Sequence, residues 1–197
     1  MYNQIYSKIT DALVSDGYII IQNALEQTLP QKLLNLTKHE SHFKKAGISS
    51  ASDLHIDKDK RSNKILWLNE EGEYESDFLA FAEGLKEYLN RSLFLGLSYY
   101  ESHLSVYNVG DFYEKHFDSF QHSKNRVVTT VYYLNDTWSE DDGGELLIYD
   151  INEKIIAKVL PNSNTLVVFM SEKFPHEVLS TNKKRYCIAG WFRVDKI

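Results

Sequence analysis

The chain has 197 residues, 43% of them hydrophobic and 13% aromatic, which is enough for a packed core and excludes an intrinsically disordered chain. Its formal net charge of −6 argues against nucleic acid or an anionic membrane surface as the main partner. A single cysteine, Cys187, excludes an intrachain disulfide and a zinc site built from cysteines. We expect one domain over residues 1–197, in a cytoplasmic protein.

Residues 1–97 carry mostly helical patterns and are expected to support the rest of the fold. Four apolar residues fall on one face of a first helix: Ile5, Ile9, Ala12 and Leu13. Gly17 is suited to the end of this helix. A β-branched run at 18–22 then predicts a strand. Pro30 begins a second helix, and the longest helix begins near Ser76, with apolar residues recurring every three or four positions. Gly84 weakens this last helix slightly.

A long polar segment at 46–73 separates the second helix from the third and contains a short apolar strand at 65–67. Loops of this length in compact domains are often lids or binding loops. We therefore expect this segment to act as a lid near a functional site.

Residues 98–197 have the texture of strands and turns. Apolar, β-branched runs are separated by turn residues: LSVYNV, RVVTTVYYLN, ELLIYDI, KIIAKVL, NTLVVFM, HEVLS and RYCIAGWFRV. No helix-length pattern interrupts them, which favours antiparallel sheets over βαβ units. Seven or eight short strands in a row predict a mainly β fold with a double-stranded β-helix, or jelly-roll, core. The helices are expected to pack on the outer face of one sheet.

Two strong metal ligands, His116 and Asp118, stand two residues apart in the stretch VYNVGDFYEKHFDSF. On a strand, alternate side chains point the same way, so both would leave the chain side by side. The pair alone is a weak signal in a chain with seven histidines, and a surface hydrogen bond is the alternative. A first-row metal also needs a third ligand. Two histidines and one carboxylate on one face leave positions open for substrate and oxygen, as in non-haem iron oxygenases.

The remaining histidines are candidates for the third ligand: His39, His42, His55, His103, His122 and His176. His39 and His42 are three apart on a helix and fit a solvated face. His103 fits a buried histidine in the core or a cavity wall. His176 follows Pro175 and opens a late strand, which a jelly roll can bring beside an early one. His176 is therefore the expected third ligand.

The last strand, RYCIAGWFRV, has an ordinary apolar face and an unusual one. The unusual face consists of Arg185, Cys187, Ala189 and Trp191. A guanidinium on an inward face must be paired, and small side chains beside it leave room for a small carboxylate. An exposed strand with Arg185 in water is the alternative. The hydroxyls of Tyr107 and Tyr133 are placed to reach the same cavity.

Together these residues resemble the 2-oxoglutarate- and Fe(II)-dependent dioxygenases, and within them the prolyl 4-hydroxylase branch with the animal oxygen-sensing prolyl hydroxylases and their bacterial relatives. The similar segments lie between 46 and 194: RSNKILWLNEEGE, SVYNVGDFYEKHFD, RVVTTVYYLND, GGELLIY, PHEV and RYCIAGWF. The resemblance implies Fe(II), 2-oxoglutarate as co-substrate and O2, with ascorbate as a stimulant. It implies hydroxylation of a prolyl residue in a protein, coupled to decarboxylation of 2-oxoglutarate to succinate and CO2.

The resemblance also implies a role for each site residue. The residues expected to hold Fe(II) are His116, Asp118 and His176. Those expected to bind 2-oxoglutarate are Arg185, Tyr133 and Thr129 at its far carboxylate, and Tyr107 and Leu146 near its metal-chelating end. Those expected near the substrate are Arg61 and Trp67 in the lid, Tyr113 and Trp191 at the mouth, and Arg126.

One position departs from the family's pattern. Arg126 matches a basic residue that pairs with an acidic residue of the lid in animal members, but Asn63 stands at that acidic position here. The ion pair is therefore expected to be lost, which weakens any substrate specificity inferred from it.

Several readings of the function stay open. The favoured partner is a protein with a target proline, with translation factors and ribosomal proteins as first candidates by analogy with relatives, in a small catalytic core like that of bacterial members. The same chemistry on lysine, a free amino acid or another small molecule is the nearest alternative. A non-catalytic, cupin-like metal-binding module and a zinc hydrolase are the others, and in a hydrolase Arg185 would have no evident task.

Overall fold

The computed structural model describes residues 2–38, 43–45, 48–50, 53–55, 61–69, 72–119 and 125–195. Its helices are α1 (Asn3–Ser15), α2 (Leu29–Leu34) and α3 (Ser76–Leu93), with short 3-10 helices η1 (Asn35–Lys38) and η3 (Glu140–Asp142). Its strands are β1 (Tyr18–Ile21), β2 (Lys44–Lys45), β3 (Ile48–Ser50), β4 (Asp53–His55), β5 (Lys64–Trp67), β6 (Tyr99–Tyr107), β7 (Tyr113–His116), β8 (Arg126–Tyr133), β9 (Leu146–Tyr149), β10 (Ile155–Val159), β11 (Leu166–Met170), β12 (His176–Val178) and β13 (Arg185–Arg193). Within these ranges, no helix has the length and apolar character of a membrane-spanning segment.

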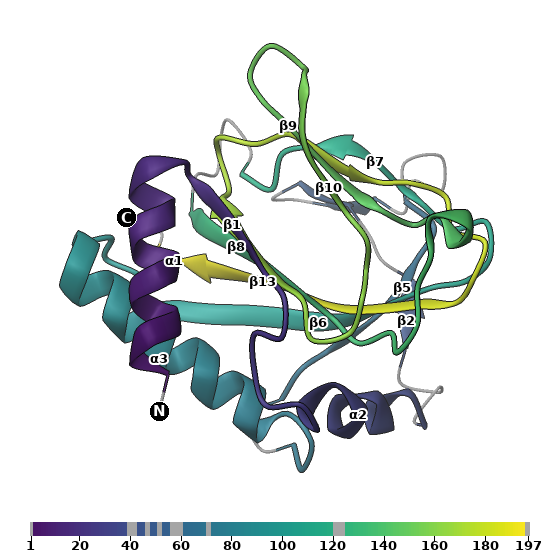
Figure 1. Cartoon of the computed structure of the whole chain (residues 1–197), viewed down its shortest axis with the longest axis horizontal. Coiled ribbons are helices and arrows are strands. Elements are labelled where there is room, and N and C mark those ends of the chain that lie inside the picture. Colours follow the sequence, from purple (N-terminus) through teal and green to yellow (C-terminus); the bar gives the residue numbers. More distant parts are fainter. Residues whose placement is uncertain are drawn as a thin grey trace.

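Most of the strands form two antiparallel sheets that lie one over the other. The larger sheet has the order β1-β11-β8-β13-β6-β5-β2, and the smaller one has the order β10-β9-β12-β7. In Figure 1 the smaller sheet lies above the larger one, and helices α2 and α3 lie below the larger sheet. Neighbouring strands come from distant parts of the chain, as in a jelly roll. The predicted mainly β fold, with helices outside one sheet, is confirmed.

The first half of the chain contributes more to the larger sheet than its helical texture indicated. Strand β1 extends one end of this sheet by pairing with β11, and β5 extends the other by pairing with β6. The later part of the predicted lid segment, 46–73, is thus anchored in the sheet at 64–67. Residues 46–47, 51–52, 56–60 and 70–71 of that segment lie outside the described residues.

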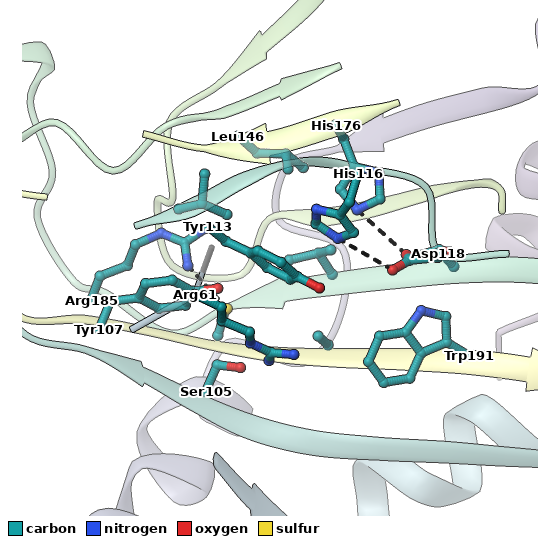
Figure 2. Close-up of a pocket in the computed structure, with 15 residues that line it drawn as sticks. Arg61, Ser105, Tyr107, Tyr113, His116, Asp118, Leu146, His176, Arg185 and Trp191 are labelled. Atoms are coloured by element: carbon teal, nitrogen blue, oxygen red, sulfur yellow. Dashed lines mark hydrogen bonds and ion pairs between the residues drawn. The ribbon is translucent and has the colours of Figure 1, made fainter. Parts of the chain in front are cut away.

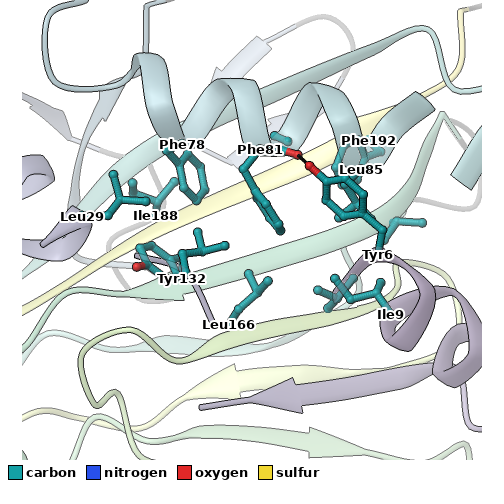
Figure 3. Close-up of a cluster of buried hydrophobic side chains, with 14 of the residues drawn as sticks. Tyr6, Ile9, Leu29, Phe78, Phe81, Leu85, Tyr132, Leu166, Ile188 and Phe192 are labelled. Atoms are coloured by element: carbon teal, nitrogen blue, oxygen red, sulfur yellow. Dashed lines mark hydrogen bonds between the residues drawn. The ribbon is translucent and has the colours of Figure 1, made fainter. Parts of the chain in front are cut away.

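Helices α1 and α3 cover the outer face of the larger sheet with one apolar cluster (Figure 3). On α3, Phe78, Phe81 and Leu85 recur at intervals of three and four and are at most 3% exposed. The Phe78 ring stacks on Tyr132 of β8 with 5.5 Å between centroids. Burying one such side chain contributes about 1.5–3 kcal/mol. The inner face of the larger sheet is turned toward the smaller sheet. The helices therefore support the larger sheet on the side away from the space between the two sheets.

Gly84 has a packing role that helix propensity does not show. A Cβ atom at this position would lie 2.5 Å from the hydroxyl oxygen of Tyr6, which donates a hydrogen bond to the Phe81 carbonyl across 3.0 Å. We expect Gly84→Ala to lower the free energy of unfolding by about 1–3 kcal/mol in urea titrations, because overpacking outweighs the gain of about 1 kcal/mol in propensity. In a Tyr6→Phe background, which lacks the oxygen, the loss should be clearly smaller. An equal loss in both backgrounds would contradict this explanation.

Candidate active site

A cavity of about 40 Å³ lies between the two sheets. One of its walls is formed by alternate residues of β13, which are Arg185, Cys187, Ala189 and Trp191. Ile188 and Phe192, on the other face of the same strand, belong to the apolar cluster under the helices. Both faces of β13 therefore lie as strand alternation predicted, and Arg185 faces the cavity rather than water.

His116, Asp118 and His176 meet at one end of this cavity (Figure 2). Strand β12 pairs with β7 so that His176 lies opposite His116. The Nε2 atoms of His116 and His176 lie 3.5 Å and 3.4 Å from the two Asp118 carboxylate oxygens. Asp118 follows the end of β7 rather than continuing it, so its side chain is aimed by the turn and not by strand alternation. The three ligand atoms lie within 4.8 Å of one another, as a shared metal ion requires.

Contacts on the outer side of each ligand orient it toward this common point. His116 Nδ1 lies 2.7 Å from the Glu114 carbonyl oxygen, and His176 Nδ1 lies 3.1 Å from the Phe174 carbonyl oxygen. A carbonyl accepts a hydrogen bond, so each Nδ1 carries the proton and each Nε2 lone pair faces inward. Thr129 donates a 2.9 Å hydrogen bond to Asp118 Oδ2. The triad is thus held in the orientation and tautomers that bind a metal.

The protonation states of the triad also suit a metal. Burial lowers the pKa of His176 to about 4, even though the Asp118 carboxylate beside it acts in the opposite direction. Burial on its own would raise the pKa of Asp118, but His176 and His116 hold it well below its usual value. Near neutral pH the site therefore offers a carboxylate and a neutral imidazole, the forms that coordinate metals.

The other candidate histidines do not join the triad in the part of the chain that the structure describes. His39, His42 and His122 lie outside the described residues, and of His55 only the backbone, in β4, is described. His103 is 1% exposed and lies 3.1 Å through Nδ1 from the Ser105 hydroxyl, as expected for a buried histidine.

Arg185 lies at the opposite end of the cavity and is 1% exposed. Its Nε donates to the Gly144 carbonyl across 2.8 Å, and its Nη1 donates to the Cys187 sulfur across 3.2 Å. The rings of Tyr107 and Tyr133 lie 4.8 Å and 5.1 Å from the guanidinium carbon. Among the described residues, no carboxylate lies within ion-pair distance of this guanidinium, and the buried Tyr133 hydroxyl has no hydrogen-bond partner. A small carboxylate would satisfy both groups.

Two residues expected to bind 2-oxoglutarate have neighbours that their predicted roles did not include. Thr129 was expected beside Tyr133 at the far carboxylate, but it supports Asp118 at the metal end. The two residues share a face of β8 but are four positions apart, about 13 Å along a strand, so they do not reach one carboxylate together. Tyr107, expected near the metal-chelating end, lies opposite Arg185 in the β6–β13 register, and its ring lies beside the guanidinium. Leu146 of β9 lines the cavity, as expected.

Arg61, Tyr113 and His116 form a stack at one side of the cavity. The Tyr113 ring lies over the His116 ring with 3.7 Å between centroids, and the Arg61 guanidinium lies 4.6 Å from the Tyr113 centroid. Arg61 Nε also donates to the Asn63 side-chain oxygen across 2.7 Å. Arg61, expected in the lid, and Tyr113, expected at the substrate mouth, therefore both border the metal end of the cavity.

Arg126 has an ionic partner, although it does not come from the lid segment. It lies 3.0 Å from the Glu101 carboxylate and 3.8 Å from the Trp191 ring centroid. Glu101 lies opposite Trp191 in the β6–β13 register. The sequence prediction missed Glu101 because it began this strand at Leu104, five residues after its actual start.

Trp67 lies behind the cavity wall rather than in it. Its side chain is 51% exposed, and its ring packs edge-on against His103 at 5.1 Å. His103 in turn packs against Trp191 at 5.4 Å. Trp67 thus connects to the cavity-lining Trp191 through the His103 ring, and it lies in the β5 strand that pairs with β6.

The buried His103 predicts a pH dependence of stability. Burial, reinforced by the charges of Arg61 and Arg126, holds the pKa of His103 well below 6.5. Below pH 6.5 His103 therefore binds a proton in the unfolded chain but stays neutral in the folded chain. The free energy of unfolding consequently falls as the pH falls. The free energy of unfolding should therefore decrease less between pH 6 and pH 5 in His103→Met than in the original protein. We expect the difference to be up to about 1.4 kcal/mol per pH unit, measured by urea titrations. Parallel curves for the two proteins would contradict a neutral His103.

Comparisons with known proteins agree with this geometry. A family model described as the 2OG-Fe(II) oxygenase superfamily matches residues 102–193, which include the triad and Arg185. The human prolyl hydroxylase EGLN3 is 32% identical over 143 residues, which cover 67% of this chain and 58% of that protein. A Pseudomonas putida prolyl-4-hydroxylase structure has a TM-score of 0.87 at 29% identity, covering 97% of this chain and 100% of that one. A Trichoplax adhaerens prolyl hydroxylase, in complex with a hypoxia inducible factor oxygen degradation domain peptide fragment, has a TM-score of 0.84 at 25% identity, covering 96% and 89%.

The matches to curated animal relatives cover only part of those proteins. The chain spans 58% of human EGLN3 and 12% of the Caenorhabditis elegans hypoxia-inducible factor prolyl hydroxylase, to which it is 34% identical over 85 residues.

Proposed function

We propose that this chain, whose residues 102–193 match the family model of the 2OG-Fe(II) oxygenase superfamily, hydroxylates a prolyl residue of a protein substrate. The observation that carries the proposal is one cavity with a metal-binding triad at one end and a buried guanidinium without a carboxylate partner among the described residues at the other. The similarity to the Pseudomonas putida prolyl-4-hydroxylase over 97% of the chain supports proline as the target.

One end of the cavity would bind the metal and the other end would bind the co-substrate. His116, Asp118 and His176 would hold Fe(II), which with O2 supplies the oxidising power while 2-oxoglutarate is converted to succinate and CO2. Arg185 would bind the far carboxylate by charge-assisted hydrogen bonds, to which the Tyr133 hydroxyl would add a donor. The guanidinium without a carboxylate partner and the unpartnered Tyr133 hydroxyl at the far end, and the inward-facing Nε2 atoms at the near end, fit these groups.

The remaining lining residues would orient the substrate and exclude water. The stack of Arg61 on Tyr113 borders the metal end, and Trp191 forms the opposite side under the Arg126 guanidinium. Trp191 Nε1 is buried and has no hydrogen-bond partner among the described residues, so it is free to donate to a group bound in the cavity. Keeping water out protects a strongly oxidising site from side reactions.

The proposal is tested by product analysis with candidate substrates. The protein is incubated with Fe(II), 2-oxoglutarate, O2 and ascorbate, and proline-containing peptides from translation factors and ribosomal proteins are compared with free L-proline and free L-lysine. We expect succinate formation to rise with a peptide that gains one oxygen atom on proline by mass spectrometry. Oxygen on a free amino acid and on no peptide would transfer the same chemistry to a small-molecule substrate.

A variant of Arg61 should show whether binding of the peptide substrate can be impaired without loss of 2-oxoglutarate turnover. It contacts neither Arg185 nor a metal ligand directly, but reaches the triad through Tyr113. We expect Arg61→Ala to lower peptide hydroxylation at least about tenfold, as for the loss of one charged contact. Succinate release without peptide should remain close to that of the unchanged protein. Equal loss of both activities would contradict a substrate role for Arg61.

A further inference from the structure

The thiol of Cys187 lies inside the cavity, next to the group that would anchor the co-substrate. Cys187 is the only cysteine of the chain, is 3% exposed and lines the cavity. Its sulfur accepts the 3.2 Å hydrogen bond from Arg185 Nη1. The guanidinium is therefore placed to stabilise the negative charge that develops on the sulfur when it attacks an electrophile. The position combines this contact with a place on the cavity wall.

The surroundings of the thiol offer a place for an anionic oxygen. Arg185 is 1% exposed and has no carboxylate partner among the described residues. The Tyr133 hydroxyl is buried, lacks a hydrogen-bond partner there, and belongs to the residue opposite Cys187 in the β8–β13 register. The cavity volume of about 40 Å³ exceeds the roughly 10–15 Å³ that one water-sized molecule needs, so the cavity has room for a molecule as small as hydrogen peroxide.

We propose that Cys187 is a site of reversible oxidation by hydrogen peroxide, which displaces the anion bound at Arg185. In the reaction the sulfur attacks one peroxide oxygen, an S–O bond forms and the O–O bond breaks. The thiol and peroxide become a sulfenic acid and water, with the sulfur oxidised by two electrons and the peroxide reduced by two. The new oxygen would lie beside the guanidinium that donates to the sulfur and near the Tyr133 hydroxyl, which has no hydrogen-bond partner among the described residues, and its anionic form would pair with the guanidinium.

This arrangement makes oxidation and co-substrate binding mutually exclusive. Arg185 cannot pair fully with a sulfenate oxygen and with the far carboxylate of 2-oxoglutarate at once. The effect on 2-oxoglutarate rests on the proposed function, whereas the oxidation itself depends only on the thiol and its guanidinium. A peroxide-exposed protein would lose its co-substrate and recover it after reduction.

The test uses metal-free protein, so that iron does not react with the peroxide. The protein is treated with graded hydrogen peroxide, and sulfenic acid is trapped with a cyclic 1,3-diketone and measured by mass spectrometry. Because the chain has one cysteine, the label reports on Cys187 alone, and Cys187→Ser is the blank. Arg185→Met keeps the thiol and removes the guanidinium, and it should be labelled at least about tenfold more slowly.

A second measurement reads the effect on the co-substrate. After peroxide is removed and Mn(II) is added, binding of 2-oxoglutarate is measured by calorimetry, with and without dithiothreitol. We expect at least about tenfold weaker binding after oxidation, full recovery with dithiothreitol, and no change in Cys187→Ala relative to its own untreated value. Absence of label under conditions that oxidise free glutathione, or label with unchanged binding, would overturn the proposal. Untreated protein that fails to bind 2-oxoglutarate would instead count against the proposed function, while label on Cys187 would still support the oxidation site.

Discussion

Replacing Asp118 by asparagine is expected to abolish turnover of 2-oxoglutarate and to weaken metal binding by more than about 100-fold, since changes even to groups that orient ligands cost 10–100-fold. Asp118 is the anionic member of the triad and lies within 3.5 Å of both imidazoles. Asparagine keeps its shape but removes the charge that a divalent ion needs. The measurements are calorimetric titration with Mn(II) or Fe(II) and succinate release. In the original protein, a metal at 100 times its Kd should add about 2.7 kcal/mol to the free energy of unfolding, and this gain should vanish in the variant.

Thr129→Val is the matched control for this change. It leaves all three ligands in place and removes only the hydroxyl that donates to Asp118 Oδ2. Its metal affinity should fall by about 10–100-fold, between that of the original protein and that of Asp118→Asn. If Asp118→Asn retained near-normal metal affinity and succinate release, the triad would not be the metal site.

Replacing Arg185 by methionine is expected to produce the complementary defect. The half-saturating concentration of 2-oxoglutarate should rise by about 10–150-fold, because a buried charge-assisted contact worth roughly 1.5–3 kcal/mol is lost. Metal affinity should stay within about threefold, since Arg185 lies at the other end of the cavity from the triad and mutations without shared partners act almost independently. Succinate release as a function of 2-oxoglutarate concentration and metal titration together measure both effects.

Arg185→Lys is the matched control here. Lysine keeps the charge but loses the planar fork that binds a carboxylate through two nitrogens, so it should recover part of the affinity. An unchanged requirement for 2-oxoglutarate in Arg185→Met would show that the co-substrate is anchored elsewhere. Compared with each other, Asp118→Asn should mainly lose metal binding, whereas Arg185→Met should mainly lose co-substrate binding.

The predictions from sequence succeeded where a regular period links residue number to direction. Alternation along the last strand was enough to set Arg185 and Trp191 into the cavity and Ile188 into the core, because nothing interrupts the strand between them. His176 was chosen because it opens a late strand, and β12 does pair with β7 at His116. The helices of the first half followed from apolar spacing in the same way.

What sequence could not provide was the register between strands and the path of the turns. Thr129 shares a face with Tyr133, but only pairing with β13 shows that it stands opposite Trp191, at the metal end. Glu101 became a partner of Arg126 through the register of β6 against β13, which no local pattern encodes. Asp118 is aimed by a turn, for which period-two reasoning is the wrong rule even though its conclusion about the pair was right.

Strand β13 lies between β8 and β6 and carries cavity residues on one face and core residues on the other. A slip of one residue against its neighbours would exchange the two faces, burying Arg185 under the helices and turning Phe192 toward the cavity. Mispaired chains would thus forfeit their hydrophobic interior together with their ability to bind a dicarboxylate. Molecules that reach a stable state should therefore form a homogeneous population, without a well-folded but inactive fraction.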